Sequence, residues 1–177
     1  DDWSERNRTF QSMAGILNFP RTLTAADGTV EQVAGAQVSR QFFDVIGVKP
    51  IAGRTFLPTD STTRPNTVAL SEALWRTRFG SDPTLIGRAI RLGTDLFTVI
   101  GVVPEQAQVA SRANLWTPLA ELPGMDRRGL HFLLVIGRLR PGVTMSSAQG
   151  DLSSIAGALA EEFPATNKGR SVTVESL

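Results

Sequence analysis

The sequence predicts an α+β fold, and the order of its local patterns carries that prediction. The front reads strand, strand, short helix, and the back reads strand, long helix, strand. Between them, residues 68–104 run from a strand into a capped helix and then into a hairpin, with a glycine or proline at nearly every joint. This order is typical of an α+β sheet that the middle third of the chain interrupts.

The first third is predicted to open with a short helix and continue into two strands. The strands are expected over residues 13–24 and 28–38, joined by a turn at residues 26–28. Ser39 is the predicted N-cap of a helix that ends at Gly47, where a glycine can adopt a left-handed C-cap.

Residues 68–80 carry clear helix-boundary signals. Ser71 can accept hydrogen bonds from the free N–H groups of a first helical turn, which makes it the predicted N-cap. Leu70 and Trp75 occupy the two positions of a hydrophobic staple around that cap. Gly80 is placed to end the helix as a left-handed C-cap, and the proline three residues later keeps the helix from resuming.

Two short apolar runs, residues 88–92 and 96–103, follow this helix. They are separated by Gly93-Thr94-Asp95 and are predicted to form a hairpin. Pro104 lacks the N–H group that a ladder needs, so it ends the second strand. The next residues, 105–114, are polar and are expected to form a mobile loop.

The last third is predicted to contain a buried strand and the longest helix. Residues 130–139 are apolar almost throughout, which indicates a strand covered on both faces. Thr144 is the expected N-cap of the helix, and residues 171–177 form an expected last strand. The helix has one apolar stripe, made of Ala148, Leu152, Ile155, Leu159 and Phe163.

The composition is typical of a folded, water-soluble domain. Apolar residues make up 41% and charged residues 20% of the 177 residues. The formal net charge of +1 gives no global field to recruit nucleic acid, so no nucleic-acid partner is expected. The absence of cysteine excludes disulfides and thiolate metal sites, and no apolar run approaches the roughly 20 residues that span a bilayer.

Candidate catalytic residues are few. His131 is the only histidine and falls in an apolar strand pattern, which favours a structural role and provides no metal site. The serines lack a G-x-S-x-G elbow, so a Ser-His-Asp triad would have to centre on His131. The chain contains neither a P-loop nor a G-x-G-x-x-G motif, and no ATP or other cofactor is expected.

Three blocks of the chain resemble, in the expected order, parts of one domain family. They are VSRQFFDVIGVKPIAGRTFLPTD (38–60), LSEALWRTRFGSDPTLIGRAIRLGTDLFTVIGVVP (70–104) and RLRPGVTMSSAQGDL (138–152). They resemble the beginning, core and exit of the extracytoplasmic domain of MacB-type ABC transporter permeases, a group that includes FtsX-like and lipoprotein-releasing permeases. The resemblance implies a porter-like subdomain built from residues 1–54 and 129–177, which carries an inserted β-rich subdomain at residues 55–128.

The same resemblance implies a non-catalytic domain on the periplasmic or extracytoplasmic side of the bacterial inner membrane. It would couple ATP hydrolysis, by a separate cytoplasmic domain or subunit, to the handling of a substrate or partner outside the membrane. The implied partners are that ATPase, a second copy of the permease in a dimer, the membrane through flanking helices absent from this chain, and a periplasmic adaptor in macrolide-type pumps. The isolated domain is expected to be monomeric or weakly dimeric.

The residues that carry the resemblance are of types that build cores, turns and caps, so they are expected to maintain the fold. They are Phe42, Phe43, Gly47, Pro50, Gly53, Arg54, Trp75, Phe79, Gly80, Gly87, Ile100, Gly101 and Pro104. For Arg54, Arg76 and Arg78 the sequence also allows a second role, pairing with a carboxylate, because buried or interface arginines often hold carboxylates in bidentate pairs.

Two alternatives from other classes remain open on the sequence. A free-standing secreted binding module would have the same composition and fold. A small hydrolase built around His131 would lose all activity in the His131→Ala variant, whereas a transporter domain would lose only stability.

Overall fold

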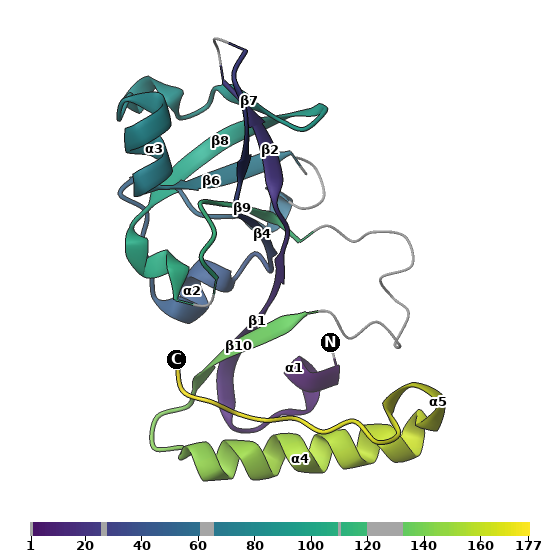
Figure 1. The fold of residues 1–177 in the computed structure, drawn as a ribbon. Helices are drawn as coiled ribbons and strands as arrows, with labels where there is room; N and C mark the ends of the chain where they lie inside the picture. Colours follow the sequence, from purple (N-terminus) through teal and green to yellow (C-terminus); the bar gives the residue numbers. More distant parts are fainter. Residues whose placement is uncertain (1, 26–27, 61–65, 110, 120–132) are drawn as a thin grey trace. The chain divides into compact units, whose positions relative to one another are not determined.

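The computed structural model describes residues 2–25, 28–60, 66–109, 111–119 and 133–177. The described residues form helices together with one mixed sheet, as Figure 1 shows, and this confirms the predicted mixed helix-and-sheet class. The helices are α1 (Asp2–Arg6), α2 (Phe42–Ile46), α3 (Glu72–Phe79), α4 (Met145–Glu162) and α5 (Pro164–Asn167), with 3-10 helices η1 (Pro58–Asp60), η2 (Pro83–Leu85) and η3 (Glu105–Gln108). The strands are β1 (Phe10–Asn18), β2 (Arg21–Thr24), β3 (Val30–Val33), β4 (Gly35–Val38), β5 (Ala52–Gly53), β6 (Thr67–Ser71), β7 (Ala89–Leu92), β8 (Asp95–Val103), β9 (Leu115–Pro118) and β10 (Leu134–Leu139).

The sheet is mixed and contains both parallel and antiparallel pairs. Within the described residues the strands follow the order β10-β1-β4-β9-β6-β8-β7-β2-β3, and β5 pairs with β8 off this path. The pairs β4–β9 and β6–β8 are parallel. The pairs β1–β4, β2–β3, β2–β7, β5–β8, β6–β9 and β7–β8 are antiparallel. Apart from the pairs β2–β3 and β7–β8, neighbouring strands of the sheet are not consecutive in the chain.

The chain divides into two compact units, each described here by itself. The first contains the described residues of 1–13 and 137–177, and the second contains those of 14–121 and 133–136. These bounds differ from the predicted subdomains, because β4 pairs with β9 and β5 pairs with β8, which places residues 14–54 in the unit that holds the β-rich middle. A division into compact units does not show which part is the porter-like subdomain and which is the inserted one. The predicted division into these two subdomains therefore stays a prediction.

The core of the first unit is built on α4. The predicted apolar stripe of this helix is confirmed, and its buried members pack with Phe10 of β1. The predicted N-cap is also confirmed, since Thr144 Oγ1 accepts a hydrogen bond of 3.1 Å from the backbone N–H of Ser147. A helix of 18 residues is thus held by one apolar face and a capped N-terminus.

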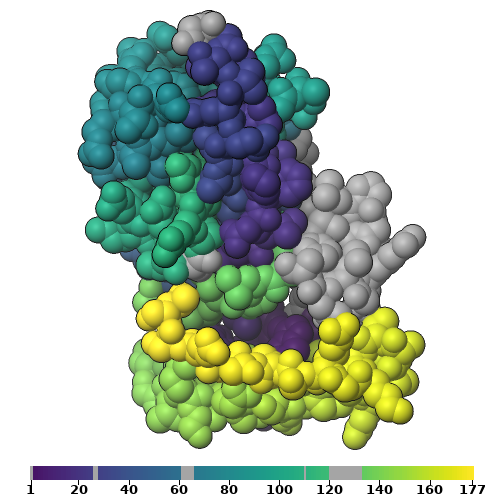
Figure 2. All heavy atoms as spheres, in the orientation of Figure 1, coloured from purple at the N-terminus to yellow at the C-terminus, as the bar shows by residue number. Residues whose placement is uncertain are grey.

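The predicted last strand is wrong, because residues 171–177 pair with no strand among the described residues. They form an extended segment that runs alongside α4, drawn in yellow in Figures 1 and 2. The Gln149 side chain donates to the Val172 carbonyl at 2.8 Å and accepts from the Val174 N–H at 2.8 Å. One side-chain amide on α4 therefore provides the donor and acceptor that a neighbouring strand would have supplied.

The second unit contains two apolar clusters. One is aromatic at its centre, where the ring of Phe43 lies 5.2 Å from Phe42, 5.6 Å from Phe56 and 5.8 Å from Trp116. The other gathers leucines and valines of β6, β7, β8 and β9 with Leu74 of α3. The edge-to-face contacts in the first cluster are the arrangement that aromatic quadrupoles favour.

The signals read around α3 are confirmed. Ser71 Oγ accepts from the Leu74 N–H at 3.1 Å, and Gly80 has the left-handed φ of 58° that its C-cap role requires. The predicted hairpin is also present as β7 and β8. Its loop is only Gly93-Thr94, because Leu92 pairs with Asp95.

The predicted strands over residues 13–24 and 28–38 are each broken in two. Pro20 lacks a ladder donor, and the Phe19 N–H instead donates to the Gly35 carbonyl at 2.8 Å. The chain changes partner at this point: β1 pairs with β4, whereas β2 pairs with β3 and β7. Residues 26 and 27 of the predicted turn lie outside the described residues.

Two further expectations are wrong for reasons that the tertiary structure supplies. Ser39 does not cap α2, because its Oγ accepts from the Gly15 N–H at 2.9 Å. Gln41 stands at the N-cap, and its side chain does not cap the helix. The segment 105–114, expected to be a mobile loop, includes η3, and Ala107 and Ala113 of this polar segment are buried in the aromatic cluster.

The strand predicted over residues 130–139 is shorter and more exposed than expected. Within its described part, β10, Ile136 is buried, but Leu134 is 51% and Val135 is 49% exposed. The prediction that both faces are covered is therefore wrong for this part. β10 ends the order of strands in the sheet, so the apolar run does not report a central, doubly covered strand.

Candidate functional site

A close contact between two strands organises the candidate site. β5 pairs antiparallel with β8, and Gly53 lies opposite Gly101. A Cβ atom at Gly53 would lie 2.2 Å from the Ile100 carbonyl oxygen, and one at Gly101 would lie 2.2 Å from the Arg54 carbonyl oxygen. Gly53 also has a φ of 68°. Both positions therefore require glycine, and their contact fixes the backbone from which the Arg54 side chain leaves.

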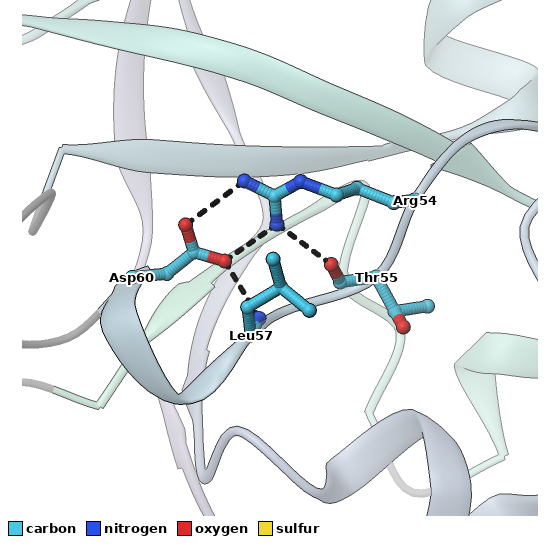
Figure 3. Close-up of polar contacts among 4 residues, drawn as sticks. All are labelled: Arg54, Thr55, Leu57 and Asp60. Atoms are coloured by element: carbon cyan, nitrogen blue, oxygen red, sulfur yellow. Dashed lines mark hydrogen bonds and ion pairs between the residues drawn. The ribbon is translucent and has the colours of Figure 1, made fainter.

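Arg54 forms a bidentate ion pair with Asp60, shown in Figure 3. Arg54 Nη1 donates to Asp60 Oδ2 at 2.6 Å and Nη2 donates to Oδ1 at 3.0 Å. The carboxylate is 1% exposed and also accepts from the Leu57 N–H at 2.7 Å. Arg54 Nη1 makes a further bond of 2.9 Å to the Thr55 carbonyl. The hydrogen bond to Asp60 raises the pKa of Arg54, so the guanidinium stays charged.

The predicted bidentate pairing is thus confirmed for Arg54. Arg78, whose side chain is 50% exposed, forms an ion pair with Glu31 of β3 through one nitrogen, and Arg76 is exposed on α3. Of the three arginines, Arg54 alone has a partner carboxylate that is almost completely buried. Its pair is the one that can fix a local structure.

A cavity of about 720 Å³ lies in the second unit beside this pair. Its walls come from the end of β5, the turn before β7, the start of β6 and the middle of β8. Its side chains include the apolar Ile86, Val99 and Ile100 and the polar Arg54, Asn66 and Thr98. A volume in this range matches the sites that hold small organic molecules in proteins.

The structure places the residues of the family signature in both clusters and at turns. Phe42 and Phe43 are fully buried, and the Trp75 indole donates to the Asp82 carbonyl at 3.0 Å. Four glycines of the signature have positive φ: Gly47, Gly53, Gly80 and Gly87. Pro50 follows α2, Phe79 packs on the leucine cluster, and Pro104 precedes η3. Their assignment as fold-maintaining residues stays a prediction.

Part of this signature lies together at the cavity, and no pattern in the sequence predicts this. Gly53, Arg54, Gly87 and Ile100 all line it, although 47 positions separate the first from the last. Asp60, Asn66 and Thr98 were not singled out either. Asp60 had a usable signal, a carboxylate six residues after an arginine that ends a glycine turn; the other two had none.

The described residues provide no metal centre. Among them, no group of three or more His, Asp or Glu side chains is placed to hold an ion. His131 lies outside the described residues, so the structure does not place the hypothetical triad around it. No helix in the described part of the chain combines the length and hydrophobicity that crossing a membrane requires.

The fold and the site together define the class of protein. It is a mixed α/β domain with a close glycine–glycine approach between two strands, an ion pair between an arginine and a buried carboxylate, and a cavity large enough for a small molecule. Comparison with known proteins narrows the class. The family model described as the MacB-like periplasmic core domain matches residues 1–155. No curated protein matches the chain.

Solved structures share the fold at low sequence identity. The periplasmic region of MacB from Actinobacillus actinomycetemcomitans superposes with a TM-score of 0.69 at 19% identity, over 92% of this chain and 72% of that one. The extracellular domain of the noncanonic ABC-type transporter YknZ from Gram-positive bacteria gives 0.68 at 15% identity, over 93% and 82%. The chain belongs to the family of MacB-like periplasmic core domains, and the predicted resemblance and periplasmic location are confirmed.

Proposed function

We propose that this chain is a non-catalytic periplasmic domain of an ABC transporter permease, which couples ATP hydrolysis in the cytoplasm to the handling of a substrate or partner outside the membrane. The family match over residues 1–155 carries the proposal. The architecture of the second unit supports it. The close approach of Gly53 to Gly101 holds β5 against β8, and the Arg54–Asp60 pair holds η1 to the residue after β5, which suits a body that moves without deforming.

Membrane fractionation of the full native gene product tests the transporter context. We expect the product to stay in the membrane after a carbonate wash, with apolar peptides flanking this segment identified by mass spectrometry. Recovery as a free protein near 19 kDa would instead support the alternative, a secreted binding module with the same fold.

Coupling requires a second measurement on the same full protein. These 177 residues contain no cysteine, so a Ser153→Cys variant adds one labelling site among them, on the exposed face of α4. Any cysteine elsewhere in the full protein is replaced by serine before labelling. We expect the label-to-label distance in a dimer to change when ATP and vanadate are added, and to stay constant in a matched variant with an inactivated ATPase. A distance that does not respond to nucleotide contradicts the coupling role.

The dimer in this proposal forms in the full permease. The isolated 177-residue chain is expected to be a monomer or a weak dimer, because the flanking helices that would pair two copies are not in it. Sedimentation equilibrium measures this directly, and a dissociation constant below the micromolar range would contradict it.

A further inference from the structure

We propose that the cavity beside β8 binds a small amphipathic anion, a molecule with a carboxylate or similar group on an apolar body. The guanidinium of Arg54 would hold the anionic group, and the partly exposed Ile86 would contact the apolar body. This inference goes beyond the proposed coupling role and does not depend on it, since a binding site in this unit can be measured in the isolated chain.

The chemical character of the walls favours an amphipathic ligand. Ile86 is partly exposed and gives the cavity an apolar side chain, and Asn66 and Thr98 are exposed polar residues at the same cavity. Val99 and Ile100 also line the cavity, but their side chains are buried in the core. A pocket with apolar walls and a few convergent polar groups is the usual form of a small-molecule site. Burial of the apolar body would contribute affinity, and the polar groups would orient it.

Arg54 provides a free hydrogen-bonding edge. A guanidinium carries five N–H groups. The two on Nη1 donate to Asp60 and Thr55, and one on Nη2 donates to Asp60. The Nε–H and the second Nη2–H make no bond to any described residue. These two groups lie on one edge of the guanidinium plane, in the geometry that binds two oxygens of a carboxylate or phosphate.

The charge that a ligand can reach has a definite sign. The Arg54 side chain is 36% exposed, whereas the carboxylate of its partner Asp60 is 1% exposed. Among the described residues that line the cavity, Arg54 is the only formally charged one. A cation would therefore meet an arginine and no accessible carboxylate, so the site selects anions.

The ion pair with Asp60 also prepares the site. Asp60 and the Thr55 carbonyl hold the guanidinium in place before any ligand arrives, as Figure 3 shows. The rotamer entropy of a long side chain is then already lost in the free protein, which reduces the cost of binding. The remaining edge of Arg54 is presented by a rigid support rather than by a mobile side chain.

Octanoate is the first probe, added to the ¹⁵N-labelled chain and followed by NMR. We expect saturable shifts at the amides of Gly87, Thr98 and Val99, weaker shifts with octan-1-ol, and none with octyltrimethylammonium. A second pair of probes, acetyl-Leu-Leu with a free carboxylate and acetyl-Leu-Leu amide, tests whether the natural ligand is a peptide or a fatty acid. Tighter binding of the free acid than of octanoate assigns the site to a peptide carboxylate, and the reverse assigns it to a lipid-derived one.

Two variants locate the site. Arg54→Lys keeps the charge but removes the bidentate edge, and we expect octanoate affinity to fall about tenfold, with Arg76→Lys as its matched control. Thr98→Trp would fill the cavity while Arg54 and Asp60 are kept, and it should abolish the shifts. Thr94→Trp in the β7–β8 loop should not. Equal binding of the cation, full affinity in Thr98→Trp, or no saturable shift with either carboxylate at millimolar concentration overturns the proposal.

Discussion

Gly53 shows how one residue can decide a local structure. Its φ of 68° is a backbone conformation that side chains strain, and a Cβ at this position would lie only 2.2 Å from the Ile100 carbonyl oxygen. Each of these two features disfavours any residue other than glycine. We expect Gly53→Ala to lower the free energy of unfolding by about 3 kcal/mol in urea titrations, from backbone strain plus displacement of β5 from β8. Gly93→Ala is the matched control. Gly93 has a φ of 64° but no atom within 4 Å of a Cβ, so it should cost only about 1 kcal/mol. Equal costs would contradict a steric role for the β5–β8 contact.

Arg54 acts through the carboxylate that it neutralises. In the native structure the Asp60 carboxylate is 1% exposed, and Arg54→Ala removes its bidentate partner. We expect a loss of about 2 kcal/mol in unfolding free energy, less than for a fully buried pair because the arginine is 36% exposed. Arg76→Ala, on the exposed face of α3, should change stability by less than about 0.5 kcal/mol. Similar stability of the two variants would show that the pair contributes little.

At the scale of elements, Asp151 joins α4 to the start of β1. Its Oδ2 accepts from the Arg8 N–H and the Thr9 hydroxyl, both at 2.8 Å. The backbone hydrogen bond from Arg8, followed by the bond from Thr9, lowers the pKa of Asp151. The folded-state pKa thus lies below the unfolded value of about 3.9. The stabilisation is complete above that value and is lost as the pH falls through the folded-state pKa.

This direction gives a pH-dependent prediction. Asp151→Asn should be less stable than the unsubstituted chain by about 1 kcal/mol at pH 7. The difference should shrink toward zero as the pH falls below about 3.9, where the native carboxyl is progressively protonated. Urea unfolding of both proteins across this range measures it. A difference that stays constant down to low pH would mean that the carboxylate charge is not involved.

At the scale of the whole molecule, three apolar clusters have no residue in common. Leu152→Ala removes a buried side chain of the α4 stripe and should cost about 3 kcal/mol in the first unit. Because α4 packs in its own cluster, hydrogen exchange should accelerate at the α4 amides while β6 and β8 keep their protection. Ser153→Ala, at the exposed neighbouring position, should change neither. Equal loss of protection in β6 and β8 would show that the two units unfold as one.

The sequence by itself determined the features that depend on neighbours a few residues away. The caps at Ser71 and Thr144, the glycine stops at Gly47 and Gly80, and the α4 stripe all follow from spacings within one helix, so residue types were sufficient. The ordered blocks also predicted the family, which the match over residues 1–155 confirms. Of the candidate site, the sequence indicated Arg54 as a residue that pairs with a carboxylate.

The tertiary structure decided what depends on residues far apart in the chain. The change of strand partner at Pro20, the exposure of β10 and the docking of residues 171–177 by Gln149 reflect which strands and helices become neighbours. Gly53 meets Gly101 only because β5 returns to β8, and the cavity forms where segments from four strand regions converge. Local propensity contains no information about such contacts, because their free energy comes from packing between segments that the sequence keeps apart.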